Sequence, residues 1–275
     1  MSYTDSADAA ESSGPPGGDL GADLQLGLEL ADLADSVTRR WWRNPALNAR
    51  RKPDGTIVTP ADEQVEEVLR VRLAAARPAD AVLGEEQGLS GSFGAPRTWV
   101  LDPIDGTSHF FRGRIGFATL ISLLIGGVPV IGVISMPARG SRWWGAVGLV
   151  ADSTGGPLHV SDAASLADAS VVVAEPLSWG EHQPGLELVH AQAAETYPAA
   201  DIGLFCDVAE GRADVALIPS GDVWDLAAPY AVVTAAGGVC SDLTGTPRPD
   251  GRALVAAAPR LHAQVLVLLN SVRRT

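Results

Sequence analysis

The sequence predicts a layered α+β and α/β sandwich, in which helices cover and separate two sheets. Over residues 21–152, several strand-like runs follow two helical segments, which is typical of an α+β layer with an antiparallel sheet. Over residues 153–275, short strands and helices alternate, which indicates a second, α/β layer packed on the first. Residues 1–20 are rich in Ser, Ala, Asp, Gly and Pro, and we expect a flexible tail there.

The composition of the 275 residues limits the class of protein. Hydrophobic residues make up 46% and charged residues 19%, so we expect a globular chain with a real core. The net charge of −13, without a basic stripe, argues against a nucleic-acid partner. Because an acidic protein repels phosphate esters, any phosphate chemistry would require bound cations.

Several features lead us to expect a cytoplasmic protein. Cys206 and Cys240 lack metal-site spacing and sit in apolar stretches, so we expect buried free thiols in a reducing compartment. The N-terminus has neither the basic nor the apolar region of a signal peptide. The longest apolar run, 117–125, is too short to cross a membrane, so we expect no membrane association.

The first elements are helices. Spaced leucines predict an amphipathic helix over about 22–40. A loop at 50–55 and a short extended piece at 56–58 follow. Thr59 and Pro60 then favour a second helix, as its N-cap and its first helical position.

The remaining elements follow from apolar runs and their punctuation. In the first layer we expect strands at 81–83, 99–101, 117–125, 128–136 and 142–148, two of them joined by a Gly-Gly hairpin turn. In the second layer we expect strands at 170–174, 199–202, 213–218, 239–242 and 254–258. The helices between them are expected at 184–195, 203–211, 224–236 and 261–272.

Two carboxylates follow the expected strand at 99–101. Asp102 and Asp105 are three residues apart and precede Gly106, Thr107 and a helical-looking segment. Carboxylates at a strand end can hold hard cations, and backbone N–H groups at a helix start can bind an anion. The pattern therefore predicts a site for a metal-bound phosphate.

Three further acids stand at element ends, and each has a structural alternative. Asp62 and Asp225 fall in the first turns of expected helices, where a carboxylate complements the helix dipole. Glu85 follows Gly84 at the end of a short strand, although paired acids are usually solvated surface. Sequence spacing alone leaves both interpretations open for each acid.

Together these motifs resemble the inositol monophosphatase-like phosphatases, which are metal-dependent and lithium-sensitive. The resemblance covers about residue 22 to the end and rests on four motifs in the family's order: 58–62, 84–86, 102–107 and 224–228. Further details, including Arg142-Trp143-Trp144 and 209–214, are similar to the bacterial histidinol-phosphatase type. The resemblance implies the αβαβα sugar-phosphatase fold and a homodimer.

The resemblance also implies a Mg²⁺ site with two or three ions. Glu85, Asp102 and the carbonyl of Ile104 would hold one ion. Asp102, Asp105 and Asp225 would hold a second, and a third, weaker ion would lie near Glu85. This assignment agrees with chemistry, because Mg²⁺ prefers oxygen ligands and hydrolysis of a phosphate monoester needs a very large reduction of its barrier.

The same resemblance assigns the catalytic and phosphate-binding groups. Thr107 and Asp62 match the pair that orients and deprotonates the attacking water, and Glu85 completes the catalytic set. The backbone N–H groups of Gly106, Thr107 and Ser108 would bind the phosphate. Asp62 and Asp225 are therefore expected to act both as helix caps and in the site.

The expected substrate is a small phosphate monoester similar to histidinol phosphate. Asp201 matches an acid that contacts the leaving group in histidinol-phosphatase-like relatives. Ile218 stands where relatives commonly place a second acid, and His109 either contacts the phosphate or packs. Inositol, sugar or nucleotide phosphates of a biosynthetic pathway stay as alternative substrates.

Two other classes of protein share part of this pattern. A haloacid-dehalogenase-type phosphatase also has an Asp-rich loop with Gly-Thr, but its aspartates are two residues apart, not three as in Asp102 and Asp105. An inactive, metal-binding regulatory relative is the alternative of a different class. The presence of every expected metal acid and of Thr107 argues against it.

Overall fold

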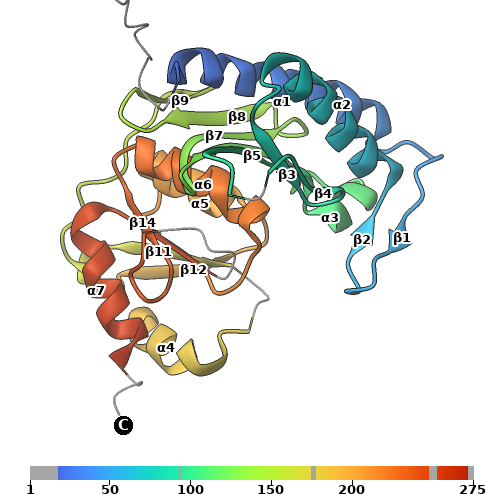
Figure 1. Ribbon diagram of the computed structural model, residues 1–275. Helices are drawn as coiled ribbons and strands as arrows, with labels where there is room; N and C mark the ends of the chain where they lie inside the picture. Colours follow the sequence, from blue (N-terminus) through green and yellow to red (C-terminus); the bar gives the residue numbers. More distant parts are fainter. Residues whose placement is uncertain (1–17, 93, 175–177, 248–252, 272–275) are drawn as a thin grey trace, which may run out of the picture.

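The computed structural model describes residues 18–92, 94–174, 178–247 and 253–271, which form five layers (Figure 1). Two helices cover an eight-stranded sheet, and two further helices separate it from a five-stranded sheet. Another pair of helices covers the outer face of the smaller sheet. The predicted αβαβα layered fold is confirmed. The division into a tail (1–20), an N-terminal α+β layer that binds the metal (21–152) and a C-terminal α/β layer (153–275) stays a prediction.

Helices α1 (Leu20–Trp41) and α2 (Pro60–Ala76) pack side by side on one face of the larger sheet. The Asp19 carboxylate caps α1 by accepting hydrogen bonds of 2.9 and 3.1 Å from two first-turn N–H groups. The helix therefore starts at Leu20 rather than at about residue 22. The rest of the predicted tail, residues 1–17, lies outside the described residues.

The larger sheet has the strand order β10-β9-β8-β7-β6-β5-β3-β4. Its strands are β3 (Ala81–Gly84), β4 (Gly88–Ser90), β5 (Arg97–Asp105), β6 (Ala118–Ile125), β7 (Val128–Met136), β8 (Ser141–Ala146), β9 (Val150–Ser153) and β10 (Gly156–Pro157). The predicted antiparallel sheet is correct except at one pair, because β3 and β5 are parallel. Strand β4 forms an antiparallel hairpin with β3 at the edge of the sheet. Strand β5 then pairs with the other side of β3 and runs in the same direction as β3. Strands β1 (Arg50–Arg51) and β2 (Ile57–Val58) form a separate small hairpin.

The smaller sheet has the order β12-β11-β13-β15-β14. Its strands are β11 (Ser170–Ala174), β12 (Glu195–Ala199), β13 (Val215–Ile218), β14 (Val239–Ser241) and β15 (Leu254–Ala257), and helices α4 (Gln183–Gln192) and α7 (Pro259–Leu269) cover its outer face. The short 3₁₀ turns η1 (Leu166–Asp168) and η2 (Gly180–His182) precede β11 and α4. The predicted strand at 199–202 is wrong. The real strand, β12, is an edge strand with mostly exposed side chains, so it lacks the apolar run that marks a buried strand.

Helices α5 (Gly203–Ala209) and α6 (Val223–Ala235) fill the space between the two sheets. Helix α6 packs closely against β7 at Gly132. A Cβ atom at this position would lie only 2.3 Å from the carbonyl oxygen of Ala228, so the contact requires glycine. Cys206 and Cys240 are buried free thiols, as predicted. Within the described part of the chain, no helix combines the length and apolar character needed to cross a membrane.

Candidate active site

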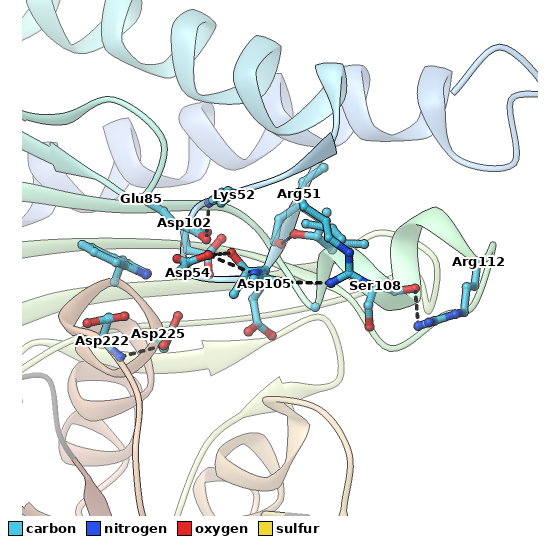
Figure 2. A pocket seen from close by; sticks show the side chains of 17 residues that line it. Arg51, Lys52, Asp54, Glu85, Asp102, Asp105, Ser108, Arg112, Asp222 and Asp225 are labelled. Atoms are coloured by element: carbon cyan, nitrogen blue, oxygen red, sulfur yellow. Dashed lines mark hydrogen bonds and ion pairs between the residues drawn. The ribbon is translucent and has the colours of Figure 1, made fainter. Parts of the chain in front are cut away.

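A cavity of about 680 Å³ lies where the ends of β3 and β5 meet the start of α6 (Figure 2). Its walls include Glu85, which follows β3, and Asp102 and Asp105 of β5. Asp225, in the first turn of α6, closes it from the other half of the chain. The fold thus brings together in one cavity acids that the sequence places up to 140 residues apart, from residue 85 to residue 225.

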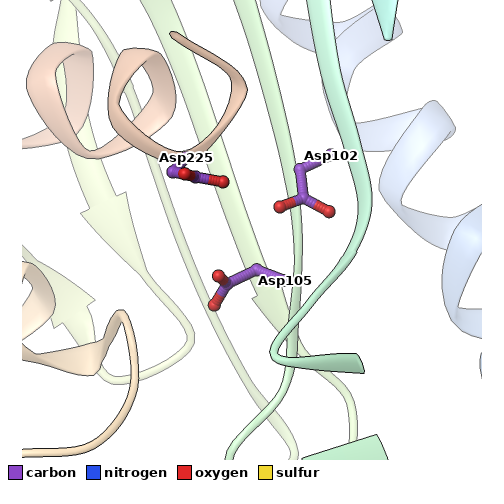
Figure 3. A group of neighbouring side chains, drawn as sticks. All are labelled: Asp102, Asp105 and Asp225. Carbon is purple, nitrogen blue, oxygen red and sulfur yellow. The ribbon is translucent and has the colours of Figure 1, made fainter. Parts of the chain in front are cut away.

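Three of these acids form a tight group, here called the three-acid group (Asp102, Asp105 and Asp225). One carboxylate oxygen from each lies within 4.8 Å of the other two (Figure 3). Asp102 is only 1% exposed, whereas the other two are partly exposed. All three line the cavity; Asp102 and Asp105 come from β5 of the sheet, and Asp225 comes from α6.

A β-bulge in β5 makes this group possible. Residues three apart on a regular strand point to opposite faces of a sheet. In β5, however, Asp102 pairs with Leu120 and Asp105 with Ala118, so one extra residue lies between them. The bulge restores a common face for both carboxylates and accommodates Pro103, which lacks an N–H donor. Asp102 therefore lies inside β5 and not after the end of a strand at 99–101, and the bulge was not predicted.

The electrostatics of the three-acid group favour a bound cation. Burial, with repulsion from neighbouring carboxylates, raises the pKa of Asp102 and of Asp105 well above the usual range. Burial also raises the pKa of Asp225 to about 6. Among the described residues, Asp102 Oδ1 is buried without a hydrogen-bond partner. An unpartnered buried carboxylate oxygen is costly unless a cation binds it, and an all-oxygen donor set suits Mg²⁺.

Glu85 lies in the same cavity but outside the three-acid group. Its Oε1 atom accepts a hydrogen bond of 2.8 Å from Nζ of Lys52, which also lies 2.7 Å from Glu86 Oε1. Lys52 belongs to the hairpin of β1 and β2, which forms one wall of the cavity. The contact joins the site to a segment that was expected only as a loop, and it was not predicted. The only signal for it was the basic run Arg50-Arg51-Lys52.

Thr107 lines the cavity, and Asp62 is fully buried behind it without lining the cavity itself. Thr107 Oγ1 lies 3.0 Å from Asp62 Oδ1 and 3.0 Å from the carbonyl oxygen of Ile104. The other oxygen of Asp62 accepts the N–H of Thr59 at 2.8 Å and so caps α2. Burial raises the pKa of Asp62 to about 6.

Asp225 likewise combines a capping role with a place in the site. Its Oδ2 atom accepts the N–H of Asp222 at 2.7 Å and caps α6, while the same carboxylate belongs to the three-acid group. The capping interpretation and the site interpretation are therefore compatible for Asp62 and for Asp225.

The segment after β5 turns sharply into α3 (Thr107–Phe111). Gly106 has a φ of +74°, and a Cβ atom there would lie 2.7 Å from the carbonyl oxygen of Gly116. Only glycine fits such a position without strain. The N–H groups of Thr107 and Ser108 belong to the first turn of the helix, where no helical carbonyl can accept them. Gly106, Thr107 and Ser108 all line the cavity.

The predicted substrate-binding residues lie on the far side of the three-acid group. Asp201 and Ile218 line a second cavity of about 190 Å³, which Asp105 and Asp225 also line. The Asp201 carboxylate forms an ion pair with Arg139, a partner that the sequence analysis missed. His109 lines neither cavity, and its ring lies beside Gly116, where a Cβ atom would be 2.6 Å from Nδ1.

Stabilisation of the protein by Mg²⁺ is expected to increase as the pH rises from 5 to 7.5. The pKa of Asp62 and of Asp225 is about 6 in the folded protein, above the ordinary value of 3.8. The folded state therefore binds protons more tightly than the unfolded state. As the pH rises from about 4 to 6, the metal-free protein loses stability, by about 3 kcal/mol for Asp62 alone. Above pH 6 the carboxylate of Asp225, a member of the three-acid group, is ionised and available to a cation.

Thermal unfolding with and without Mg²⁺ at both pH values measures this effect. The rise in Tm caused by Mg²⁺ should be larger at pH 7.5 than at pH 5. An equal rise at both pH values would show that protonation of Asp225 does not compete with the cation.

Comparison with known proteins identifies the class. The chain is 42% identical over 258 residues to a histidinol-phosphatase of Mycobacterium tuberculosis, with 90% of this chain and 98% of the relative covered. It is 39% identical over 259 residues to a histidinol-phosphatase of Streptomyces coelicolor, with 90% and 97% covered. The solved structure of an inositol monophosphatase from Zymomonas mobilis is similar, with a TM-score of 0.79 and 28% identity over 91% of this chain and 98% of that one.

These likenesses, with the fold and the carboxylate cavity, define the protein as a phosphomonoesterase. The sequence model of the inositol monophosphatase family matches residues 24–274. The chain belongs to the inositol monophosphatase family. The resemblance drawn from the four motifs is thereby confirmed.

Proposed function

We propose that the protein is a Mg²⁺-dependent hydrolase of a small phosphate monoester similar to histidinol phosphate. The observation that carries the proposal is that the three-acid group and Thr107 line one cavity, and that the Thr107 hydroxyl lies 3.0 Å from the buried carboxylate of Asp62. The names of the two relatives with the highest identity reported above, both histidinol-phosphatases, support this choice of substrate.

The residues of the chain divide the chemistry between them. Mg²⁺, when bound, would supply an activated water and neutralise charge on the ester. The three-acid group, Glu85 and the carbonyl of Ile104 would hold the ions. Thr107 Oγ1 and Asp62 Oδ1 orient the attacking water and receive its proton, and a pKa of about 6 suits Asp62 to act as a base near neutral pH. The first-turn N–H groups of α3 orient the phosphate, and no covalent nucleophile is required.

The leaving alcohol would occupy the second cavity, with Asp201 and Ile218 in its wall and His109 nearby. Two observations keep inositol, sugar or nucleotide phosphates as alternative substrates. The charge of Asp201 is already balanced by Arg139, and the position expected to carry a second acid is the apolar Ile218.

A panel of phosphate-release assays with Mg²⁺ tests the proposal. It should contain histidinol phosphate, inositol 1-phosphate, nucleoside 5′-monophosphates, 3′-phosphoadenosine 5′-phosphate and several sugar phosphates. We expect the highest kcat/KM with histidinol phosphate, inhibition by Li⁺, and a homodimer by light scattering. Release from no ester would contradict the proposal and favour the binding-only alternative.

Arg139→Gln is expected to shift substrate preference toward esters that carry an ammonium group. Without its partner, the Asp201 carboxylate can pair with the substrate, and a gain of about 1 kcal/mol corresponds to roughly fivefold in kcat/KM. The ratio of kcat/KM for histidinol phosphate to that for inositol 1-phosphate measures the shift. Arg72→Gln, which breaks the ion pair with Glu29 between α1 and α2, is the control. An unchanged ratio would mean that Asp201 does not contact the leaving group.

A further inference from the structure

Glu66 is a carboxylate of α2 that is entirely buried, and it lines neither cavity. Its Oε2 atom accepts the backbone N–H of Glu86 at 2.7 Å, and its Oε1 atom accepts that of Gln87 at 3.0 Å. Arg70 Nε donates to Oε1 as well, at 2.8 Å. Both oxygens are therefore used, and charge-assisted bonds of this kind are the strong ones.

The two N–H groups belong to the turn between β3 and β4, which also carries Glu85. The end of β3 is shaped to admit the carboxylate: a Cβ atom at Gly84 would lie only 2.2 Å from Glu66 Oε1. Arg70 holds the far side of the same turn, donating to the carbonyl oxygen of Gly88 at 2.5 Å and to Ser90 Oγ at 2.9 Å. The Glu66–Arg70 pair thus holds the turn by hydrogen bonds to Glu86 and Gln87 and to the first residues of β4.

Glu85 lies between the residues held by Glu66 and the strand β5 of the larger sheet. Its own N–H donates to the carbonyl oxygen of Leu101 at 3.1 Å, one residue before Asp102. The backbone on either side of Glu85 is therefore fixed to two elements, α2 through Glu66 and β5 through Leu101. The direction in which the Glu85 side chain enters the cavity depends on both.

We propose that Glu66 is a positioning residue, which holds the Glu85 turn in the geometry that metal binding requires. The inference rests on the proposed function, because it takes Glu85 as a metal ligand. Asp62 lies four residues before Glu66 and so on the same face of α2. One helix face therefore sets the positions of both the proposed base, Asp62, and the proposed ligand, Glu85.

Glu66→Gln tests the proposal, because glutamine keeps the shape but loses the charge and one acceptor. We expect the Mg²⁺ concentration for half-maximal phosphate release to rise by about tenfold or more, while the rate at saturating Mg²⁺ changes little. Calorimetric titration of the protein with Mg²⁺ alone should show the same loss of affinity without any substrate. Should this variant not fold, Arg70→Gln removes the charge of the other member of the pair and should shift the Mg²⁺ requirement in the same direction.

Asp23→Asn is the matched control. Asp23 is another buried, ion-paired carboxylate on a helix of the same layer, held by Arg77 at 2.8 Å and Arg97 at 2.9 Å. It should lower Tm without changing the Mg²⁺ requirement. The proposal is overturned if Glu66→Gln also lowers Tm alone, with unchanged Mg²⁺ affinity. A wild-type protein whose phosphate release ignores Mg²⁺ would instead contradict the proposed function itself.

Discussion

Replacing Asp105 with asparagine is expected to reduce Mg²⁺-dependent phosphate release by at least about 1,000-fold, equivalent to about 4 kcal/mol of barrier. Asp105 supplies one of the three oxygens that converge in the three-acid group, and an amide cannot balance the charge of a divalent cation there. The measurement is the initial rate of phosphate release over a range of Mg²⁺ concentrations. Activity that survives the substitution would contradict the metal mechanism.

The same variant should keep its fold. Removing one charge from the group relieves the repulsion that, with burial, raises the pKa of Asp102, so the metal-free variant should be at least as stable as the wild type. The rise in Tm on adding Mg²⁺ should shrink. Asp32→Asn is the control, since this α1 carboxylate is largely exposed and pairs with Arg142 away from the cavity. It should leave both activity and the Mg²⁺ effect unchanged.

Thr107→Val is expected to lower kcat by about 100-fold to 1,000-fold with little change in the Mg²⁺ requirement. Valine has nearly the shape of threonine but lacks the hydroxyl that lies 3.0 Å from Asp62 Oδ1. The water would lose a partner that orients it, whereas the three-acid group would keep its ions. Rates measured at saturating Mg²⁺ and a Mg²⁺ titration together separate these two effects.

Thr107→Ser should restore most of the lost activity, because it returns the hydroxyl. Thr38→Val is the matched control: this threonine is also buried, and its hydroxyl bonds only to carbonyl oxygens within α1. If Thr107→Val weakens Mg²⁺ binding as Asp105→Asn does, the hydroxyl acts on the metal site and not on the water. Such a result would move Thr107 out of its proposed role.

Most of the fold followed from apolar patterning, and its failures have a common cause. Strands such as β6 and β7 are buried on both faces and appear as long apolar runs, so the sequence predicted them within about one residue. The edge strand β12 exposes most of its side chains and lacks that signal. The parallel pairing of β3 with β5 depends on where the hairpin strand β4 lies, which local sequence does not encode.

The candidate site divides in a similar way. The acids of the site stand in short motifs with recognisable spacing, so the sequence could nominate them. The β-bulge that turns Asp102 and Asp105 to one face is a property of pairing with β6, not of β5 alone. The ion pairs Lys52–Glu85 and Arg139–Asp201 join residues 33 and 62 positions apart, and only the folded chain brings them together.

The close contact of α6 with Gly132 has a consequence for when the protein becomes competent during folding. A helix that slipped by one residue along the sheet would move Asp225 by about 1.5 Å along its axis and turn it by about 100°. Because Gly132 has no Cβ atom, α6 can pack against β7 in one position, with Ala228 directly over the strand. A chain whose halves have formed but not yet docked would hold Asp102 and Asp105 without their third partner. Hydrolytic capacity would thus arise at the final assembly step, and not in either half beforehand.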